Sequence, residues 1–209
     1  MVQDKGRPQE VVLTGGIGSG KSSVGRILRQ WGAHVVDADA LAREVVSPGT
    51  AGQAQVLAEF GPGVLSADGS LIRAALADRV FVDADQLSRL ERIIHPLVHR
   101  AAAERLALNT GAPLLVYEVP LPGRSPFLHE PVVVVVDAPD EIRRERLRMR
   151  GLVEAQIEAR MTSQPSRDEW LAMADRVVDN GGSLEDLRAN VARLWRELIG
   201  EEPPVGVGG

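Results

Sequence analysis

Short, continuously apolar runs alternate along the chain with longer segments whose apolar residues recur at the three- to four-residue spacing of a helix. Strands that are buried on both faces of a parallel sheet have this continuous apolar character, and helices make the crossover connections between them. The pattern therefore predicts an α/β fold built on a parallel sheet of five strands. The runs predicted to be strands are 11–14, 33–36, 114–117, 131–136 and 176–179.

A long stretch without a strand signal separates the second predicted strand from the third. It covers about 75 residues, whereas a connection between parallel strands needs only about 10–12. The excess predicts a helical insertion over 41–110, and an insertion of that size usually carries a substrate. Its longest predicted helix, 85–108, is interrupted at Pro96, and His95 beside it is either a packed, hydrogen-bonded side chain or a functional one. The shorter predicted helices are 41–46, 53–60 and 71–80.

The rest of the chain is predicted to form one domain around this insertion, as a length of 209 residues favours. The polar extension 1–9 precedes it, and the Pro- and Gly-rich tail 201–209 is predicted to be disordered because it has little to bury. The core is assigned to 10–40, 111–142 and 174–200. The predicted helices outside the insertion are 22–31, 140–150, 152–164 and 183–199, the last begun by a Ser183 cap.

Composition narrows the class of protein. Hydrophobic residues make up 44% and charged residues 25%, which is ordinary for a globular domain. The chain has no cysteine, which excludes a thiol nucleophile, a disulfide framework and a Cys-ligated zinc site. A net charge of −5 argues against nucleic-acid and anionic-membrane partners, and no apolar run approaches the length of a membrane span or a secretory signal. We therefore expect a cytoplasmic protein that acts on small molecules, as a monomer or a weak homo-oligomer.

Residues 15–22 read Gly-Gly-Ile-Gly-Ser-Gly-Lys-Ser and fit the phosphate-binding pattern G-x-x-x-x-G-K-[ST], between a predicted strand and a predicted helix. Glycines let successive backbone N–H groups turn toward phosphate oxygens, and the helix adds its positive N-terminal end. Lys21 would reach the β- and γ-phosphates of ATP, and the Ser22 hydroxyl would ligate Mg²⁺. The residues predicted to contact the ATP phosphates are Gly16, Ile17, Gly18, Ser19, Gly20, Lys21, Ser22 and Ser23.

Lys21 is further evidence for a phosphate site, because the chain uses arginine almost everywhere else. It contains 22 arginines and only two lysines. A lysine at this position indicates that a compact ammonium is needed where a planar guanidinium would not fit.

Acidic residues follow three of the predicted strands. Ligands of an open α/β sheet bind beyond the carboxyl ends of its strands, so Asp37 and Asp39 are expected to face the phosphate site. One could accept the proton of an attacking hydroxyl, and the other could cap the next helix; both could also be caps or turn residues. Glu118 and Asp137 also end strands, and they are the two candidates for a further Mg²⁺ ligand.

Five arginines are concentrated between residues 143 and 150. On a helix, those at 143, 146 and 150 share one face and those at 144 and 148 share another. The segment is either a solvated helix paired with Glu141 and Glu145, or a lid over 143–165 that brings an arginine onto the transferring phosphoryl group. The surplus of arginines over the two glutamates favours the lid.

Several segments together resemble the dephospho-CoA kinase family. Their order and spacing carry the resemblance, which spans residues 11 to 198, nearly the whole chain. The segments are 13–22 (Leu-Thr-Gly-Gly-Ile-Gly-Ser-Gly-Lys-Ser), 36–39 (Val-Asp-Ala-Asp), 42–46 (Ala-Arg-Glu-Val-Val) with Pro48 and Gly49, 93–96 (Ile-Ile-His-Pro) and 174–180 (Ala-Asp-Arg-Val-Val-Asp-Asn).

The resemblance implies a three-layer P-loop core like that of nucleoside monophosphate kinases, with a helical acceptor-binding insertion and a helical lid. It also implies Mg²⁺-dependent transfer of the ATP γ-phosphoryl group to the ribose 3′-hydroxyl of dephospho-CoA, the last step of coenzyme A synthesis. On that pattern Asp39 is the catalytic carboxylate and acts together with Lys21. Arg43 and His95 would help to bind the acceptor, and Arg146 or Arg150 would be the lid arginine.

The chain departs from the family pattern at one place. It reads Val-Pro-Leu-Pro-Gly-Arg over 119–124, where the family usually has Pro-Leu-Leu followed by an acidic residue. Two other functions remain as alternatives: another small-molecule kinase with the same core, and a nucleotide-dependent switch or binding protein. The absence of an Asn-Lys-x-Asp sequence weakens the case for a GTPase.

Overall fold

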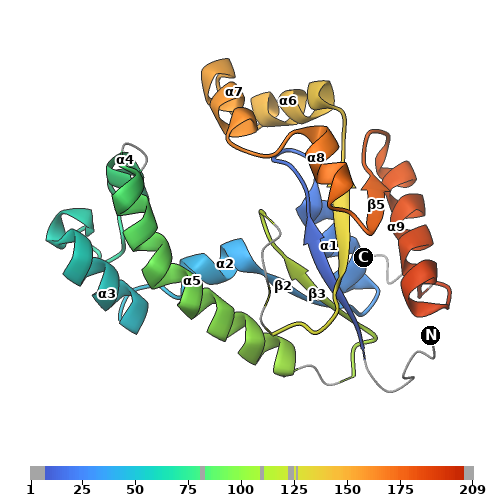
Figure 1. Cartoon of the computed structure of the whole chain (residues 1–209), viewed down its shortest axis with the longest axis horizontal. Coiled ribbons are helices and arrows are strands. Elements are labelled where there is room, and N and C mark those ends of the chain that lie inside the picture. Colours follow the sequence, from blue (N-terminus) through green and yellow to red (C-terminus); the bar gives the residue numbers. More distant parts are fainter. Residues whose placement is uncertain (1–7, 81–82, 109–110, 122–124, 126, 205–209) are drawn as a thin grey trace. The chain divides into compact units, whose positions relative to one another are not determined.

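The computed structural model describes residues 8–80, 83–108, 111–121, 125 and 127–204 (Figure 1). The chain divides into two compact units. We call Met1–Val36 together with Asn109–Gly209 the core unit, and Asp37–Leu108 the helical unit.

The core unit is built on a five-stranded sheet with the order β2-β3-β1-β4-β5. The central strand β1 lies parallel to β3 on one side and to β4 on the other, and Val11 is paired with both Val116 and Val132. Valine and leucine side chains make the inner strands almost fully buried, as expected for a sheet covered on both faces. The predicted α/β fold with a parallel sheet is therefore confirmed. The strands are β1 Gln9–Thr14, β2 His34–Asp37, β3 Leu114–Glu118, β4 Val132–Asp137 and β5 Arg176–Asp179.

Two amphipathic helices, α1 (Lys21–Gln30) and α9 (Leu184–Ile199), pack against each other and against the sheet. Their apolar faces join the strands in the main hydrophobic core. The rings of Trp31 and Trp195 meet edge to face, with 5.9 Å between their centroids. The Ser183 hydroxyl caps α9 by accepting from the Asp186 N–H, as the sequence predicted. The other helices of the core unit are α6 Asp140–Met149, α7 Glu154–Thr162 and α8 Arg167–Ala172.

The helical unit has its own small core. Helices α2, α3 and α4 all pack on the long helix α5. The buried side chains of this core are Val56, Phe60, Val64, Leu76 and Val80. Its elements are α2 Ala38–Glu44, α3 Ala51–Phe60, the 3₁₀ turn Pro62–Val64, α4 Arg73–Val80 and α5 Ala84–Ala107.

Two expectations about helices are wrong, and one short helix was not predicted. The interruption at Pro96 is absent, because α5 continues through it; packing against three other helices outweighs the lost backbone hydrogen bond. Helix α2 begins at Ala38 rather than at residue 41, because Asp37 caps it. The short helix α8 was not predicted; Ser166 and Glu169 start it with a reciprocal capping box.

In the part of the chain that the structure describes, no helix is long and apolar enough to cross a membrane. Most of the predicted polar extension and of the predicted disordered tail lies outside the described residues, as do residues 122–124 of the divergent segment.

Candidate functional site

The phosphate loop, residues 15–20, connects the end of β1 to the start of α1, as the motif predicts. Gly20 caps the helix with φ +97°, and a Cβ on it would lie 2.1 Å from Nδ2 of Asn180. That amide instead donates a 2.6 Å hydrogen bond to the Ser19 carbonyl. Only glycine satisfies both the backbone angle and this close approach.

The loop offers several backbone donors. Among the described residues, the N–H groups of Gly18, Gly20 and Ser22 find no hydrogen-bond acceptor. The ammonium of Lys21 folds back over the loop and donates a 2.7 Å hydrogen bond to the Gly15 carbonyl. The Ser19 N–H, which the motif assigned to phosphate, donates instead to the Gly16 carbonyl at 3.1 Å. The open donors and the lysine charge together form a cradle for an anion.

Arg143 of α6 lies directly against the loop and is only 4% exposed. Its Nε donates to the Ile17 carbonyl at 2.9 Å, and its Nη1 donates to Asp140 at 2.9 Å. A Cβ on Gly16 would lie 2.4 Å from Nη2 of Arg143, so this glycine is needed for the arginine as well as for the loop. The Ile17 N–H in turn donates to Oε1 of Gln164 at 2.7 Å.

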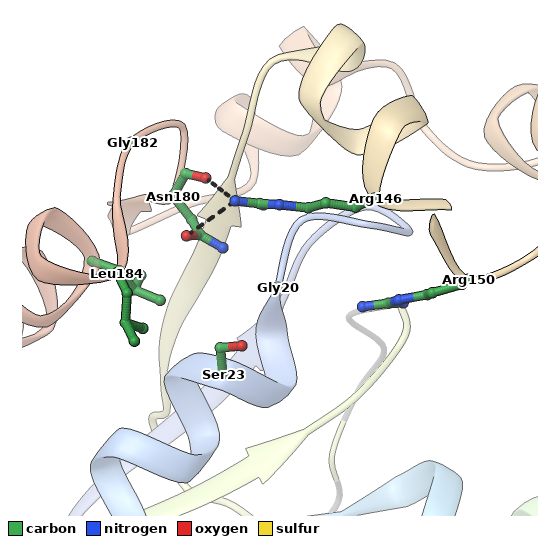
Figure 2. A pocket seen from close by; sticks show the side chains of 8 residues that line it. Gly20, Ser23, Arg146, Arg150, Asn180, Gly182 and Leu184 are labelled. Carbon is green, nitrogen blue, oxygen red and sulfur yellow. Dashed lines mark hydrogen bonds between the residues drawn. The ribbon is translucent and has the colours of Figure 1, made fainter. Parts of the chain in front are cut away.

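Arg146, one turn along α6, bridges the loop to the end of β5. Its Nη2 donates to the Asn180 carbonyl at 2.9 Å, and its Nη1 donates to the Ser19 carbonyl at 3.3 Å. Figure 2 shows this guanidinium lying beside a pocket of about 250 Å³. The pocket is lined by Gly20, Ser23, Arg146, Arg150, Asn180, Gly182, Leu184 and Leu187.

Arg150, just after α6, also lines this pocket. It is exposed, and its guanidinium forms no hydrogen bond or ion pair with any described residue. In Figure 2 its side chain extends toward the start of α1. The sequence offered Arg146 and Arg150 as candidates for the lid arginine. Arg146 donates hydrogen bonds to backbone carbonyls, whereas Arg150 does not.

The other face of α6 makes different contacts. Arg144 forms ion pairs with Glu154 at 2.8 Å and with Glu158, and Arg148 pairs with Glu154 at 3.0 Å. These hydrogen bonds lower the pKa of both glutamates, through Arg148 for Glu154 and through Arg144 for Glu158. The predicted division of the five arginines between two helix faces is therefore confirmed. The acidic partners of Arg144 and Arg148 lie on α7, however, and not at Glu141 and Glu145.

Asp37 and Asp39 have different surroundings. The Asp37 carboxylate accepts hydrogen bonds from the N–H groups of Asp39 at 2.8 Å and Ala40 at 3.1 Å, so it is the N-cap of α2. The Asp39 carboxylate is exposed and has no hydrogen-bond partner among the described residues. The structure thus assigns the cap to Asp37 and leaves Asp39 available for chemistry.

Glu118 and Asp137, the two candidate Mg²⁺ ligands, also differ in their contacts. Asp137 is held by both Nε and Nη2 of Arg167, at 2.9 Å and 2.7 Å, and this contact raises the pKa of the arginine. Glu118 lies against α1, where a Cβ on Gly25 would be 2.7 Å from its Oε2. Gly25 is one turn beyond Ser22, so Glu118 lies against the helix that also carries the hydroxyl that the motif assigns to the metal.

In the described residues no three His, Cys, Asp or Glu side chains are grouped so as to hold a metal ion by themselves. Nucleotide kinases do not need such a group, because Mg²⁺ is usually held by one or two protein oxygens, the substrate phosphates and water.

The predicted acceptor residues lie in the helical unit. Arg43 is exposed and lines a largely apolar pocket of about 340 Å³ together with Val46, Leu71, Leu76 and Ile94. His95 is exposed and does not line it; its ring stacks on that of His99, with 6.4 Å between centroids. Burial, and then the charge of His95, lower the pKa of His99.

Asn180 and Gln164 were not among the predicted site residues. The sequence did offer a signal for Asn180, since it directly follows the last strand and the carboxyl ends of parallel strands collect ligand contacts. Gln164 carries no such signal, because its contact with Ile17 joins positions 147 residues apart.

Comparison with known proteins gives a consistent result. The family model described as dephospho-CoA kinase matches residues 10–186. A dephospho-CoA kinase of Thermobifida fusca is 47% identical over 191 residues, which is 90% of this chain and 96% of that relative. The solved structure of TT1252 from Thermus thermophilus has a TM-score of 0.78 and 37% identity, covering 92% of this chain and 98% of that one. The dephospho-CoA kinase of Campylobacter jejuni shares the fold, with a TM-score of 0.67 and 23% identity over 93% of this chain and 98% of that one.

Proposed function

The chain belongs to the dephospho-CoA kinase family, and we propose that it transfers the γ-phosphoryl group of ATP to the ribose 3′-hydroxyl of dephospho-CoA. The products are ADP and coenzyme A. The observation that carries this proposal is the phosphate loop, which combines open backbone N–H groups with the Lys21 ammonium in a chain of this family.

The pocket in Figure 2 is the proposed site of the adenine ring. It adjoins the phosphate loop at Gly20, so a base placed there is continuous with phosphates in the loop. Arg146 is held by the carbonyls of Ser19 and Asn180. A fixed planar guanidinium stacks well on an aromatic base. The side chains of Leu184 and Leu187 supply apolar contact.

The groups available for transfer have separate tasks in this proposal. Asp39 orients the acceptor hydroxyl and takes its proton as the oxygen attacks the γ-phosphorus. Lys21 and the open loop N–H groups stabilise negative charge on the phosphates. Arg150, whose guanidinium is not committed to a protein acceptor, is the arginine that we assign to the transferring group.

The residues near the start of α1 fit a magnesium ion. Ser22 supplies a hydroxyl and Glu118 a carboxylate beside the same helix, and oxygen donors are the ligands that Mg²⁺ prefers. When bound, the ion would neutralise charge on the β- and γ-phosphates. Asp137 is a poorer choice because Arg167 already occupies both of its oxygens.

The pocket of the helical unit is the proposed acceptor site. Its apolar walls suit the aliphatic arm of dephospho-CoA, and the Arg43 guanidinium at the same pocket suits the acceptor's phosphates. His95 does not line this pocket, so its proposed part in acceptor binding would lie outside it.

The test is an ATP-dependent phosphorylation assay with dephospho-CoA, adenosine, AMP and shikimate as separate acceptors, read by ADP release and product mass. Stoichiometric formation of coenzyme A with dephospho-CoA, and little reaction with the others, supports the proposal. Preferential phosphorylation of another acceptor would make the chain a different kinase of the same core. ATP hydrolysis that no acceptor stimulates would favour the nucleotide-switch alternative.

A further inference from the structure

Ile17 of the phosphate loop is held from outside at both its carbonyl and its N–H. Its carbonyl accepts from Nε of Arg143 at 2.9 Å, and its N–H donates to Oε1 of Gln164 at 2.7 Å. Arg143 lies in α6 and Gln164 lies between α7 and α8, so two parts of the predicted lid form hydrogen bonds with the same residue of the loop.

The segment that carries Gln164 is itself fixed to the sheet. Three residues further on, Arg167 binds both carboxylate oxygens of Asp137, at the end of β4. Strand β4 pairs directly with β1, the strand that leads into the loop. The Gln164 amide is therefore positioned by a strand that neighbours the loop's own strand.

The donors of the loop fall into two groups. The N–H of Ile17 is used by a protein side chain, whereas the N–H groups of Gly18, Gly20 and Ser22 have no acceptor among the described residues. Gly18 and Gly20 give the backbone rotational freedom. This freedom must be restricted before the open N–H groups converge on one anion. Fixing Ile17 at both its N–H and its carbonyl limits that freedom where the loop leaves β1.

We propose that Gln164 is a positioning residue, which together with Arg143 clamps Ile17 and so preorganises the loop for the nucleotide phosphates. Gln164 acts through the loop backbone. The proposal for Gln164 rests on the proposed function only in taking ATP as the nucleotide.

The amide suits this role because it is an uncharged acceptor. A carboxylate at the same position would accept the same hydrogen bond, but its negative charge would stand beside a site built for phosphates. The two contributions, hydrogen bond and charge, can therefore be separated by substitution.

The experiment compares Gln164→Leu and Gln164→Glu with a matched control, Gln156→Leu. Gln156 also uses Oε1 to accept a backbone N–H, that of Val153 at 3.3 Å, but at the start of α7 and away from the loop. Two quantities are measured without any acceptor substrate: amide exchange at Ile17, and the Kd for ATP with Mg²⁺ from titration calorimetry.

Gln164→Leu is expected to speed amide exchange at Ile17 and to raise the Kd for ATP roughly 3- to 10-fold, as the loss of one uncharged hydrogen bond implies. Gln164→Glu is expected to keep exchange at Ile17 slow and still to raise the Kd, with a difference that shrinks at high salt. Gln156→Leu is expected to change neither quantity.

A Gln164→Leu protein with wild-type thermal stability and wild-type ATP affinity would overturn the proposal, and so would an equal loss of affinity in Gln156→Leu. If Gln164→Leu fails to fold, Gln164→Glu still tests the proposal. Unchanged ATP affinity of this variant at low salt would contradict the placement of residue 164 beside the phosphates. A chain that passes these tests but does not phosphorylate dephospho-CoA would leave the clamp standing and refute the proposed acceptor.

Discussion

Lys21 and Arg146 at the phosphate loop are held by other groups of the protein, whereas Asp39 and Arg43 in the helical unit are not held by any described residue. Around the phosphate loop, Lys21 and Arg146 already donate to backbone carbonyls. In the helical unit, the Asp39 carboxylate and the Arg43 guanidinium are exposed and have no hydrogen-bond partner among the described residues.

This difference shows whether a side chain loses its conformational freedom on folding or only when the ligand binds. Donors that folding has already fixed need no reorganisation when charge develops on a phosphate, and they stabilise it most effectively. Side chains that are free in the absence of ligand lose rotamer freedom only when the ligand binds. We infer a preorganised phosphate site and an acceptor site that is ordered by its substrate.

The largest expected effect comes from Asp39, whose carboxylate has no hydrogen-bond partner among the described residues. Asp39→Asn keeps an acceptor oxygen but cannot take a proton, so kcat should fall by roughly 10²–10⁴, the usual contribution of a general base. ATP affinity should stay near the wild-type value, because the phosphate loop is untouched. The measurements are kcat with dephospho-CoA and the Kd for ATP.

Asp37→Asn provides the comparison for Asp39. Asparagine is as good an N-cap as aspartate, so this variant should keep most of its activity and stability. A normal rate in Asp39→Asn together with a large loss in Asp37→Asn would move the catalytic role to Asp37.

Lys21→Ala should lower kcat by about 10²–10³, the range for one preorganised charge-stabilising donor. Lys21→Arg should also be poor, because the planar guanidinium cannot take the place of an ammonium bonded at 2.7 Å to Gly15. Single-turnover kinetics and thermal unfolding of both variants check this. Near-normal turnover in either would contradict the part assigned to Lys21.

Much of the core unit could be predicted from the sequence because its signals are local. The phosphate motif is contiguous, the strands are continuous apolar runs, and helical spacing alone separated the faces of α6 that carry Arg143 and Arg144. Each of these depends on residues within one or two turns of each other.

The features that escaped prediction depend on residues far apart in the chain. Asn180 meets Ser19 across 161 residues, and α5 continues through Pro96 because other helices pack on it. Asp37 and Asp39 could not be told apart from spacing, since either can cap a helix; the geometry of the first turn of α2 distinguishes them.

A smaller effect is expected at Arg150, whose guanidinium has no hydrogen-bond or ion-pair partner among the described residues. Arg150→Met should lower kcat about 10- to 100-fold, with a smaller effect on ATP affinity, because it removes a charge that acts on the transferring group. Arg148→Met is the matched control, since Arg148 pairs with Glu154 on the opposite face of α6. Steady-state kinetics of both variants make the comparison. Equal losses would show that total lid charge, and not position, matters.

The smallest expected effect concerns the ion pairs between α6 and α7. Hydrogen bonds from Arg148 and Arg144 lower the pKa of Glu154 and Glu158 below their ordinary value of 4.5. A carboxyl whose pKa is depressed by folding contributes stability that is complete above its unfolded pKa and is lost as the pH falls through the folded one. These pairs should therefore act fully at pH 7 and progressively less below about pH 4.5.

Arg144→Met isolates this contribution, because it removes a cation that faces α7 and leaves the phosphate loop unchanged. At pH 7 the variant should have a slightly lower Tm than the wild type, and its Kd for ATP should be the same. The Tm difference should shrink as the pH falls below about 4.5 and both glutamates become protonated, and it should shrink with salt because the pairs are exposed. Thermal unfolding of both proteins across this pH range measures it. A difference that persists at acid pH would mean that Arg144 stabilises the lid by packing of its aliphatic stem and not by its charge.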